Sequence, residues 1–136
     1  MTIELELFAE PYLIARLDAS NGECLGRIGG CDGQFVSVTR TDHEVSLVVE
    51  DSQINRTLFH DAREIEPHWR AFRIVGSLEF ELVGILANLT AALAAAEIPV
   101  FCLSTFLTDY ILVKEQHVSA ATVQLRKADY KVLAKP

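Results

Sequence analysis

Hydrophobic positions recur with a helical period in two segments of this chain. The first stripe consists of Leu82, Ile85, Leu86, Leu89 and Leu93. Because an α-helix completes a turn every 3.6 residues, this spacing places the five side chains on one face and predicts a helix that ends before Pro99. The segment 117–128 repeats the pattern through Val118, Ala121, Thr122 and Leu125, and predicts a second helix.

Alternation of apolar and polar residues predicts two β-hairpins. The stronger pattern covers residues 100–113, and a weaker echo covers 35–48. In the weaker hairpin, strands over 35–41 and 44–50 are joined through Asp42 and His43, residues that tolerate a tight turn. Further strands are expected over 12–17, from Trp69 onward, and over 130–133. Residues 69–133 therefore predict a complete βαββαβ unit, and the preceding half predicts a related one.

The segment 19–33 lacks the expected first helix of the N-terminal unit. It holds five of the seven glycines of the chain, and each glycine costs about 1 kcal/mol relative to alanine inside a helix. We therefore expect an irregular loop there. The segment 52–67 mixes charged and apolar residues, and we interpret it as a partly helical connector that faces solvent.

Length and charge limit the classes of protein to which the chain can belong. A unit of about 60 residues buries only roughly 60% of its unfolded surface, so two units within 136 residues should share a core. The net charge of −7 opposes binding to a phosphate backbone, so we expect no nucleic-acid partner.

No segment has the character of a targeting or membrane-spanning sequence. The N-terminus is acidic, and the uncharged run 82–96 is shorter than the roughly 20 residues that cross a bilayer. We expect a cytoplasmic protein with no membrane partner. The three cysteines indicate neither a disulfide framework nor a zinc site, and we expect Cys102 to be a small buried core residue.

Candidate chemistry outside the second unit is weak. The glycine-rich stretch 26–33 lacks the Gly-Lys-Ser/Thr ending of a phosphate-binding loop. His60, Glu64 and His68 are spaced four apart, as metal ligands on one helical face would be, but Pro67 should end that helix first. No nucleophile, base and orienting group can be assembled. We therefore expect no metal, no cofactor and no enzymatic activity.

The loop 76–84 is a better candidate site because it carries the chain from a strand into a helix. Unpaired backbone N–H groups and the positive end of the helix dipole at such a point suit a carboxylate. Gly76 and Gly84 would let the backbone approach a ligand, although each could equally serve the turn or the helix packing. Glu44 and Asp109 follow the two hairpin turns. Either is an ordinary solvated charge, or one of them, Asp109 above all, accepts a hydrogen bond from a ligand ammonium group.

Four stretches of the second unit resemble the ACT-domain family. They are Phe72–Phe80, Gly84–Ala87, Ile98–Thr105 and Thr108–Lys114, and the first-unit hairpin 35–48 is similar to the corresponding hairpin of that family. The resemblance is strongest to the tandem form that is related to the regulatory part of aspartate kinase and to the eukaryotic arginine sensors called CASTOR. One departure is that the loop reads Leu82-Val83-Gly84 where many ligand-binding members have Arg-Pro-Gly.

The resemblance implies an α+β fold of two tandem ferredoxin-like (βαββαβ) ACT units that share a continuous antiparallel sheet, the first unit lacking its first helix. The units would be residues 1–68, a degenerate N-terminal unit, and 69–136, a complete one. It also implies a small amino acid bound at the interface between units. Carried to matching positions, the ligand-binding residues are Ser77, Leu78, Glu79, Gly84, Leu103, Ser104, Thr105 and Asp109, with Val38, Thr39 and Arg40 as their first-unit partners.

Two functions are consistent with these features. The first is a regulatory sensor, without catalytic activity, that binds an amino acid or a similar small zwitterion. The second is a ligand-free module for dimerisation or protein interaction, because exposed sheet edges invite pairing. In both we expect a homodimer.

Overall fold

The computed structural model describes residues 2–75 and 84–136. The chain forms two compact units, each of which is described by itself. Residues Glu10–Trp69 form a continuous segment, the inserted unit, whereas Met1–Ala9 and Arg70–Pro136 together form the discontinuous unit. The predicted division into domains after residue 68 stays a prediction, because compactness does not test which segment folds alone.

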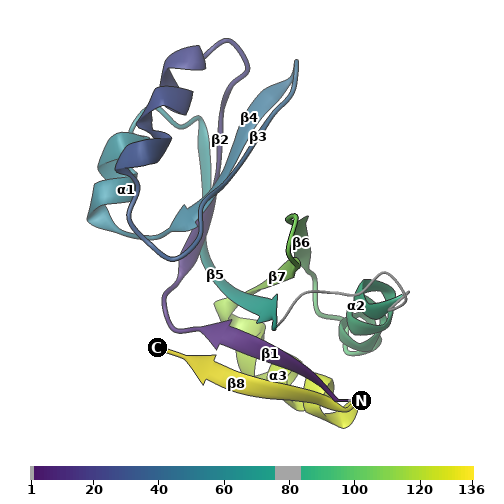
Figure 1. The fold of residues 1–136 in the computed structure, drawn as a ribbon. Coiled ribbons are helices and arrows are strands. Elements are labelled where there is room, and N and C mark those ends of the chain that lie inside the picture. The colour runs from purple at the N-terminus through teal and green to yellow at the C-terminus, as the bar shows by residue number, and fades with distance from the viewer. Residues whose placement is uncertain (1, 76–83) are drawn as a thin grey trace. The chain divides into compact units, whose positions relative to one another are not determined.

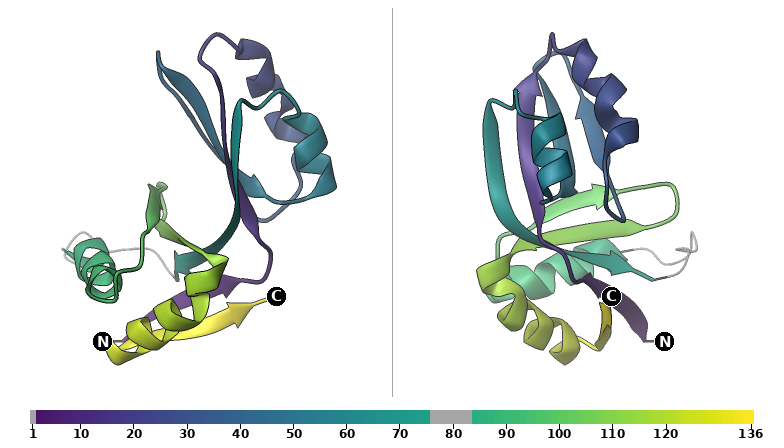
Figure 2. Two further views of the ribbon diagram at one scale, coloured as in Figure 1. Left: turned by 180° about the vertical axis from the view of Figure 1, so that it is seen from behind. Right: turned by 90° about the vertical axis from the view of Figure 1, so that its left-hand side faces the viewer.

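The inserted unit has a ferredoxin-like order of elements and strands (Figure 1). Its elements are β2 (Tyr12–Asp18), η1 (Gly22–Gly30), β3 (Ser37–Arg40), β4 (Glu44–Glu50), α1 (Gln53–Leu58) and the first part of β5 (Glu64–Ile74). The strands lie in the order β3-β4-β2-β5, and neighbouring strands are antiparallel. Apolar residues of β2 and β4 pack against η1 and the end of α1, so both helices cover the same face of this sheet (Figure 2).

The segment 19–33 differs from the expected irregular loop. No α-helix forms between Asp18 and Gly33, but η1 is a 3-10 helix in the place of the first helix of the unit. The Asn21 side chain accepts a hydrogen bond from the Cys24 backbone N–H at 3.2 Å and so caps the helix start. Cys24 is fully buried, and Ile28 packs on the same core. Capping and burial therefore outweigh the unfavourable glycines.

The discontinuous unit contains the predicted βαββαβ sequence and one additional strand. Its elements are β1 (Ile3–Phe8), the second part of β5, α2 (Ile85–Ala95), β6 (Phe101–Ser104), β7 (Asp109–Lys114), η2 (Glu115–His117), α3 (Val118–Lys127) and β8 (Tyr130–Lys135). The strand order is β6-β7-β5-β1-β8. The sequence patterns predicted no strand over 3–8, yet β1 lies between β5 and β8, antiparallel to β5 and parallel to β8.

The predicted fold class is confirmed. Because β5 takes part in both units, the eight strands of the described residues form a single open sheet, which is mixed rather than wholly antiparallel since β1 and β8 run parallel. The predicted helical stripes are confirmed within the described residues, because Leu89, Leu93 and Leu125 are fully buried against the sheet. None of the helices in residues 2–75 and 84–136 is both long enough and apolar enough to cross a membrane.

The prediction that Cys102 is a core residue is wrong. Its side chain is exposed, although its cross-strand neighbour Ile111 is almost fully buried. The difference arises because β6 is the edge strand of this unit, whereas β7 lies between β6 and β5. Desolvation nevertheless raises the pKa of the Cys102 thiol, and the nearby Asp109 carboxylate raises it further.

Strand β5 begins five residues earlier than predicted and contains a bulge. Tyr12 pairs with Trp69 and Ile14 with Glu66, so one extra residue lies on β5 between these pairs. His68 in this stretch has a positive φ of 69°. Because α1 ends at Leu58 and Glu64 opens a strand, the helical face proposed for His60, Glu64 and His68 does not form. No cluster of three metal-ligating side chains occurs within the described part of the chain.

Gly33 is the glycine whose replacement should destabilise the inserted unit most clearly. It has φ of 108°, and a Cβ atom there would lie 2.5 Å from Glu50 Oε2 and 2.9 Å from Glu50 Cβ. We expect Gly33→Ala to lower the free energy of unfolding by about 2–3 kcal/mol, through backbone strain and the clash together. Urea denaturation measures this change.

Gly26→Ala is the matched control, because a Cβ at Gly26 would meet nothing within 4 Å. Its effect should lie within about 0.5 kcal/mol of the wild-type value. Equal effects of the two substitutions would contradict this account of Gly33.

Candidate functional site

The β6–β7 hairpin of the discontinuous unit brings together several residues that the sequence analysis singled out. Leu103 and Ser104 end β6, Thr105 opens the turn, and Asp109 begins β7. Ser104 and Asp109 face each other across the two strands. The Ser104 hydroxyl donates a hydrogen bond of 2.5 Å to Asp109 Oδ1. The hairpin therefore ends in an ordered hydroxyl–carboxylate pair.

The turn of this hairpin is closed by threonines. The Thr105 backbone N–H donates to the Thr108 carbonyl oxygen at 2.8 Å, and the Thr105 hydroxyl donates to the same oxygen at 3.1 Å. The hydroxyl of Thr108 donates to the carbonyl oxygen of Ile74 at 2.8 Å. Ile74 is the last residue of β5, so the turn is tied to the point from which the chain proceeds toward residue 84. Sequence reasoning did not identify Thr108 as a site residue.

Gly84 is required by backbone conformation rather than by packing. It is the N-cap of α2, with φ 82° and ψ 9°, a left-handed conformation that favours glycine. A Cβ atom there would meet no atom of the described residues within 4 Å, so packing against that part of the chain does not explain the residue. Its carbonyl oxygen accepts the hydrogen bond from the Asn88 backbone N–H at 2.9 Å, which begins the helix. Gly76, Ser77, Leu78 and Glu79 lie outside the described residues.

The remaining predicted residues lie on the edge strand of the inserted unit. Val38 on β3 is half-buried, whereas Thr39 and Arg40 are exposed. The turn after Arg40 resembles the turn after Ser104, because the Thr41 N–H donates to the Glu44 carbonyl oxygen at 2.9 Å and Thr41 Oγ1 accepts from the Glu44 N–H at 3.1 Å.

This pairing corrects the expected equivalence of Glu44 and Asp109. Arg40 pairs with Val45, whereas Ser104 pairs with Asp109, so the structural counterpart of Asp109 is Val45. Glu44 instead corresponds to Thr108. Each turn has four residues, 41–44 and 105–108, so the acidic residue stands one position earlier along the chain in the inserted unit. Val45 is fully buried, so the inserted unit has no carboxylate at the matching position.

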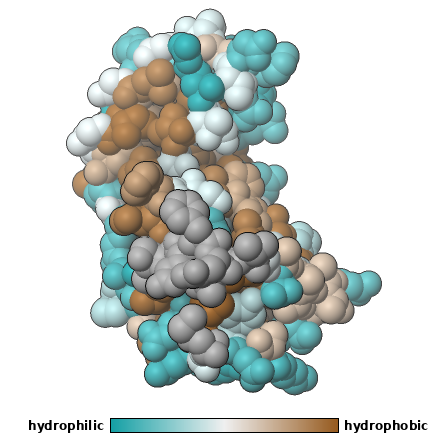
Figure 3. Space-filling model, turned by 45° about the vertical axis from the view of Figure 1, so that its right-hand side comes forward, coloured by the Kyte–Doolittle hydropathy of each residue, from teal (hydrophilic) through white to brown (hydrophobic). Residues whose placement is uncertain are grey.

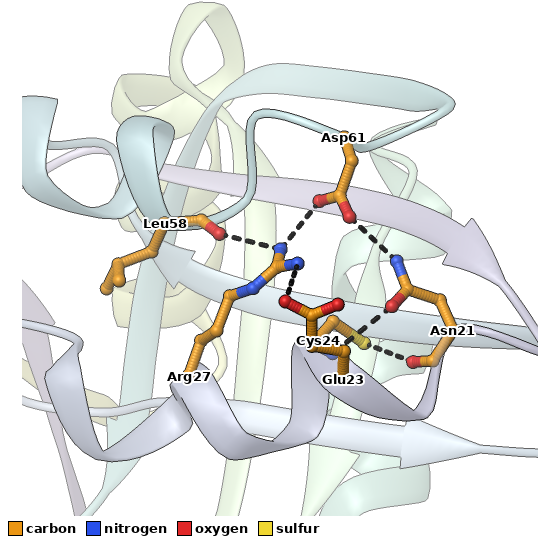
Figure 4. A network of polar contacts seen from close by, with 6 residues as sticks. All are labelled: Asn21, Glu23, Cys24, Arg27, Leu58 and Asp61. Carbon is orange, nitrogen blue, oxygen red and sulfur yellow. Dashed lines mark hydrogen bonds and ion pairs between the residues drawn. The ribbon is translucent and has the colours of Figure 1, made fainter.

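A second polar cluster lies in the inserted unit, between η1 and the connection from α1 to β5 (Figure 4). Arg27 Nη1 lies 2.8 Å from Asp61 Oδ1 and donates to the Leu58 carbonyl oxygen at 3.0 Å. Asn21 Nδ2 donates to Asp61 Oδ2 at 2.8 Å. The hydrogen bond from Arg27, followed by that from Asn21, lowers the pKa of Asp61 to about 2.

This cluster joins structural elements and is not the candidate ligand site. The adjoining cavity of about 640 Å³ is lined by Asp18, Ser20, Asn21, Asp61, Ala62 and Arg63. Its two carboxylates are engaged within the protein, Asp61 by Arg27 and Asn21, and Asp18 by Arg63 at 2.6 Å. A perturbed pKa can mark a functional group, but here the same contacts fasten η1 to the chain beyond α1.

The chain is similar to known proteins in sequence and in fold. A family model described as the ACT domain matches residues 64–127, which run from β5 through α3. The chain is also similar to protein Atu0741 from Agrobacterium tumefaciens, with 32% sequence identity and a TM-score of 0.83, over 100% of this chain and 96% of that one.

More distant solved structures share the fold. The regulatory subunit of aspartate kinase from Thermus thermophilus is 12% identical, with a TM-score of 0.69 over 91% of this chain and 95% of that one. The aspartate kinase of Clostridium acetobutylicum is 15% identical, with a TM-score of 0.67, and the match covers 88% of this chain and 33% of that one. At these identities the likeness extends to the fold alone.

The Asp61 contacts should make the stability of the protein depend on pH. The folded-state pKa of about 2 lies below the unfolded value of about 3.9, so the contribution is complete above about pH 5 and is lost as the pH falls toward 2. Because the Asp61 side chain is 30% exposed, we expect Asp61→Asn to cost about 1–2 kcal/mol at pH 7. Chemical denaturation of both proteins between pH 2 and 7 measures the difference, which should shrink toward zero at the acidic end.

Asp42→Asn is the control, because the Asp42 side chain is 88% exposed and its partner is the equally exposed His43. It should change stability by less than about 0.5 kcal/mol at any pH in this range. A difference between wild type and Asp61→Asn that stays constant from pH 7 to pH 2 would refute the assigned role of the Asp61 carboxylate.

Proposed function

Because this chain belongs to the ACT-domain family, we propose that it is a regulatory module that binds a small α-amino acid and catalyses no reaction. The observation that carries the proposal is the Ser104–Asp109 pair at the end of the β6–β7 hairpin. A regulatory role is supported by the fold shared with the regulatory subunit of aspartate kinase from Thermus thermophilus.

The hairpin offers chemistry that suits the ammonium group of the ligand. Ser104 donates its hydrogen to Oδ1 of Asp109, and an ionised carboxylate has a second oxygen that accepts hydrogen bonds. An ammonium group at that oxygen would form a charge-assisted bond, which is stronger than a bond between neutral groups. The backbone groups of Leu103 and Thr105, on either side of Ser104, are proposed to add polar contacts.

The start of α2 suits the carboxylate group of the ligand. The first turn of a helix presents N–H groups without partners inside the helix, together with the positive end of its dipole. Gly84, the N-cap of α2, has the left-handed conformation that brings the chain into the helix. Ser77, Leu78 and Glu79 are proposed to contribute the backbone groups that complete this part of the site.

The inserted unit is proposed to have a supporting role. At the position of Asp109 it carries the buried Val45, which cannot bind an ammonium group. The proposed contributions of Val38, Thr39 and Arg40 are therefore backbone contacts along β3. Amino acids share their ammonium and carboxylate groups, so specificity would come from the pocket for the ligand side chain.

A second function, self-association, is favoured by one observation. Figure 3 shows that hydrophobic as well as hydrophilic residues reach the surface on the face drawn there. At the tip of the β6–β7 hairpin, Phe106 is fully exposed and Leu107 is 65% exposed.

If the protein forms a homodimer through this tip, Phe106→Ser should yield a monomer in light scattering. A wild-type protein that stays monomeric at high concentration would exclude this mode of self-association.

Asp109→Asn tests amino-acid binding. We expect one of the twenty common L-amino acids to raise the melting temperature of the wild type, because a ligand at about 100 times its dissociation constant adds roughly 2.7 kcal/mol, or several degrees. Asp109→Asn should remove most of that shift, since the ammonium group loses its charged partner. Differential scanning fluorimetry provides the measurement.

Glu115→Gln is the matched control, because it removes one negative charge from an exposed position on η2 of the same unit. It should leave the ligand-induced shift within about a degree of the wild-type value. Either of two results counts against the proposal: the absence of any shift with all twenty amino acids at millimolar concentration, or an undiminished shift in Asp109→Asn.

A further inference from the structure

Thr108 is a buried hydroxyl-bearing residue at the end of the turn between β6 and β7. Thr108 is 4% exposed, and the only other buried polar residue among the described residues is Asn55. A buried hydroxyl is costly unless it forms a hydrogen bond. Thr108 meets that requirement through the 2.8 Å bond from its hydroxyl to the Ile74 carbonyl oxygen.

This bond fastens the end of β5 from the side of β7. On the other side, Ile74 pairs with Leu5 of β1, and the Val75 backbone N–H donates to the Glu4 carbonyl oxygen at 2.9 Å. The last residues of β5 are thus held on both sides. On the β7 side, the bond is supplied by a side-chain hydroxyl, that of Thr108.

The same residue fixes the start of β7. The backbone N–H and the hydroxyl of Thr105 donate to the Thr108 carbonyl oxygen and close the turn. Thr108 directly precedes Asp109, which accepts a hydrogen bond from Ser104. The chain from Ser104 to Asp109 is therefore connected through one hydroxyl to Ile74, the last residue of β5.

The inserted unit lacks this arrangement at the corresponding position. Its turn carries Glu44 where the discontinuous unit has Thr108, and an ionised carboxylate cannot donate a hydrogen bond to a carbonyl oxygen. The next residue is Val45 in place of Asp109. The donor and the acid are thus present together in one hairpin and replaced together in the other.

From this coincidence we propose that Thr108 is a positioning residue for the amino-acid site. Its hydroxyl holds the hairpin turn against the end of β5 and so keeps Asp109 at a fixed distance from Ile74. The inference rests on the proposed function in its effect on affinity, whereas the hydrogen bond and its effect on the hairpin do not depend on any ligand.

The test compares Thr108→Val, which removes the hydroxyl at nearly constant shape, with Thr108→Ser, which keeps it. Thr90→Val is the control, because the Thr90 hydroxyl bonds to the Leu86 carbonyl oxygen within its own helix in the same unit. Hydrogen–deuterium exchange of the full chain without ligand reports on residues 101–113. Calorimetric titration then uses the common L-amino acid that most raises the melting temperature of the wild type.

We expect Thr108→Val to accelerate exchange in the hairpin turn several-fold and to weaken binding about five- to tenfold, the effect of roughly one lost hydrogen bond. Thr108→Ser should restore both properties to within about twofold, and Thr90→Val should change neither. Unchanged exchange in Thr108→Val would overturn the inference, as would faster exchange at unchanged affinity. If no amino acid binds the wild type, the proposed function fails, and exchange alone still decides whether Thr108 anchors the hairpin.

Discussion

Strand β5 is the element on which both units depend, because each uses part of it to complete a sheet. Its first residues, from Glu64, pair with β2 in the inserted unit, and its last residues, up to Ile74, pair with β1 in the discontinuous unit. Units of about 60 residues bury too little apolar surface for ample stability, so a shared strand joins two marginal cores. The bulge near His68 changes the register between the two parts. At the end of β5, the Thr108 hydroxyl donates a hydrogen bond to the Ile74 carbonyl oxygen. This bond connects the strand to the hairpin of the candidate site.

The elements that could be predicted from the sequence are those with local signals. The stripe that includes Leu89 and Leu93 predicted α2, and alternation predicted both hairpins. Strand β1 could not be predicted, because its partners Ile74 and Val132 are distant in sequence and its own pattern is only six residues long. The helix η1 was missed because glycine content argues against α-helix but says nothing about a capped 3-10 helix. Cys102 was misplaced because apolar alternation does not distinguish an edge strand from a central one.

The candidate site shows the same division between local and long-range information. Family resemblance selected Ser104 and Asp109 from the sequence, and their hydrogen bond depends on a register that the turn length sets. The other turn has the same four-residue length, but Glu44 is its last residue, and the inserted unit has Val45 in the place of the acid. The role of Thr108 required the structure, since its partner lies 34 residues away in the chain. The two related hairpins therefore differ in the chemistry that they offer at the matching position.

We propose above all that the β6–β7 hairpin holds the ammonium group of an amino acid at Asp109, in a module that regulates rather than catalyses. A crystal structure of the full chain grown with the amino acid that binds most tightly tests the claim directly. We expect a ligand nitrogen about 3 Å from an Asp109 carboxylate oxygen and a ligand carboxylate at the residues that lead into α2. A ligand bound elsewhere, for example in the cavity beside Asp18 and Asp61, would contradict it.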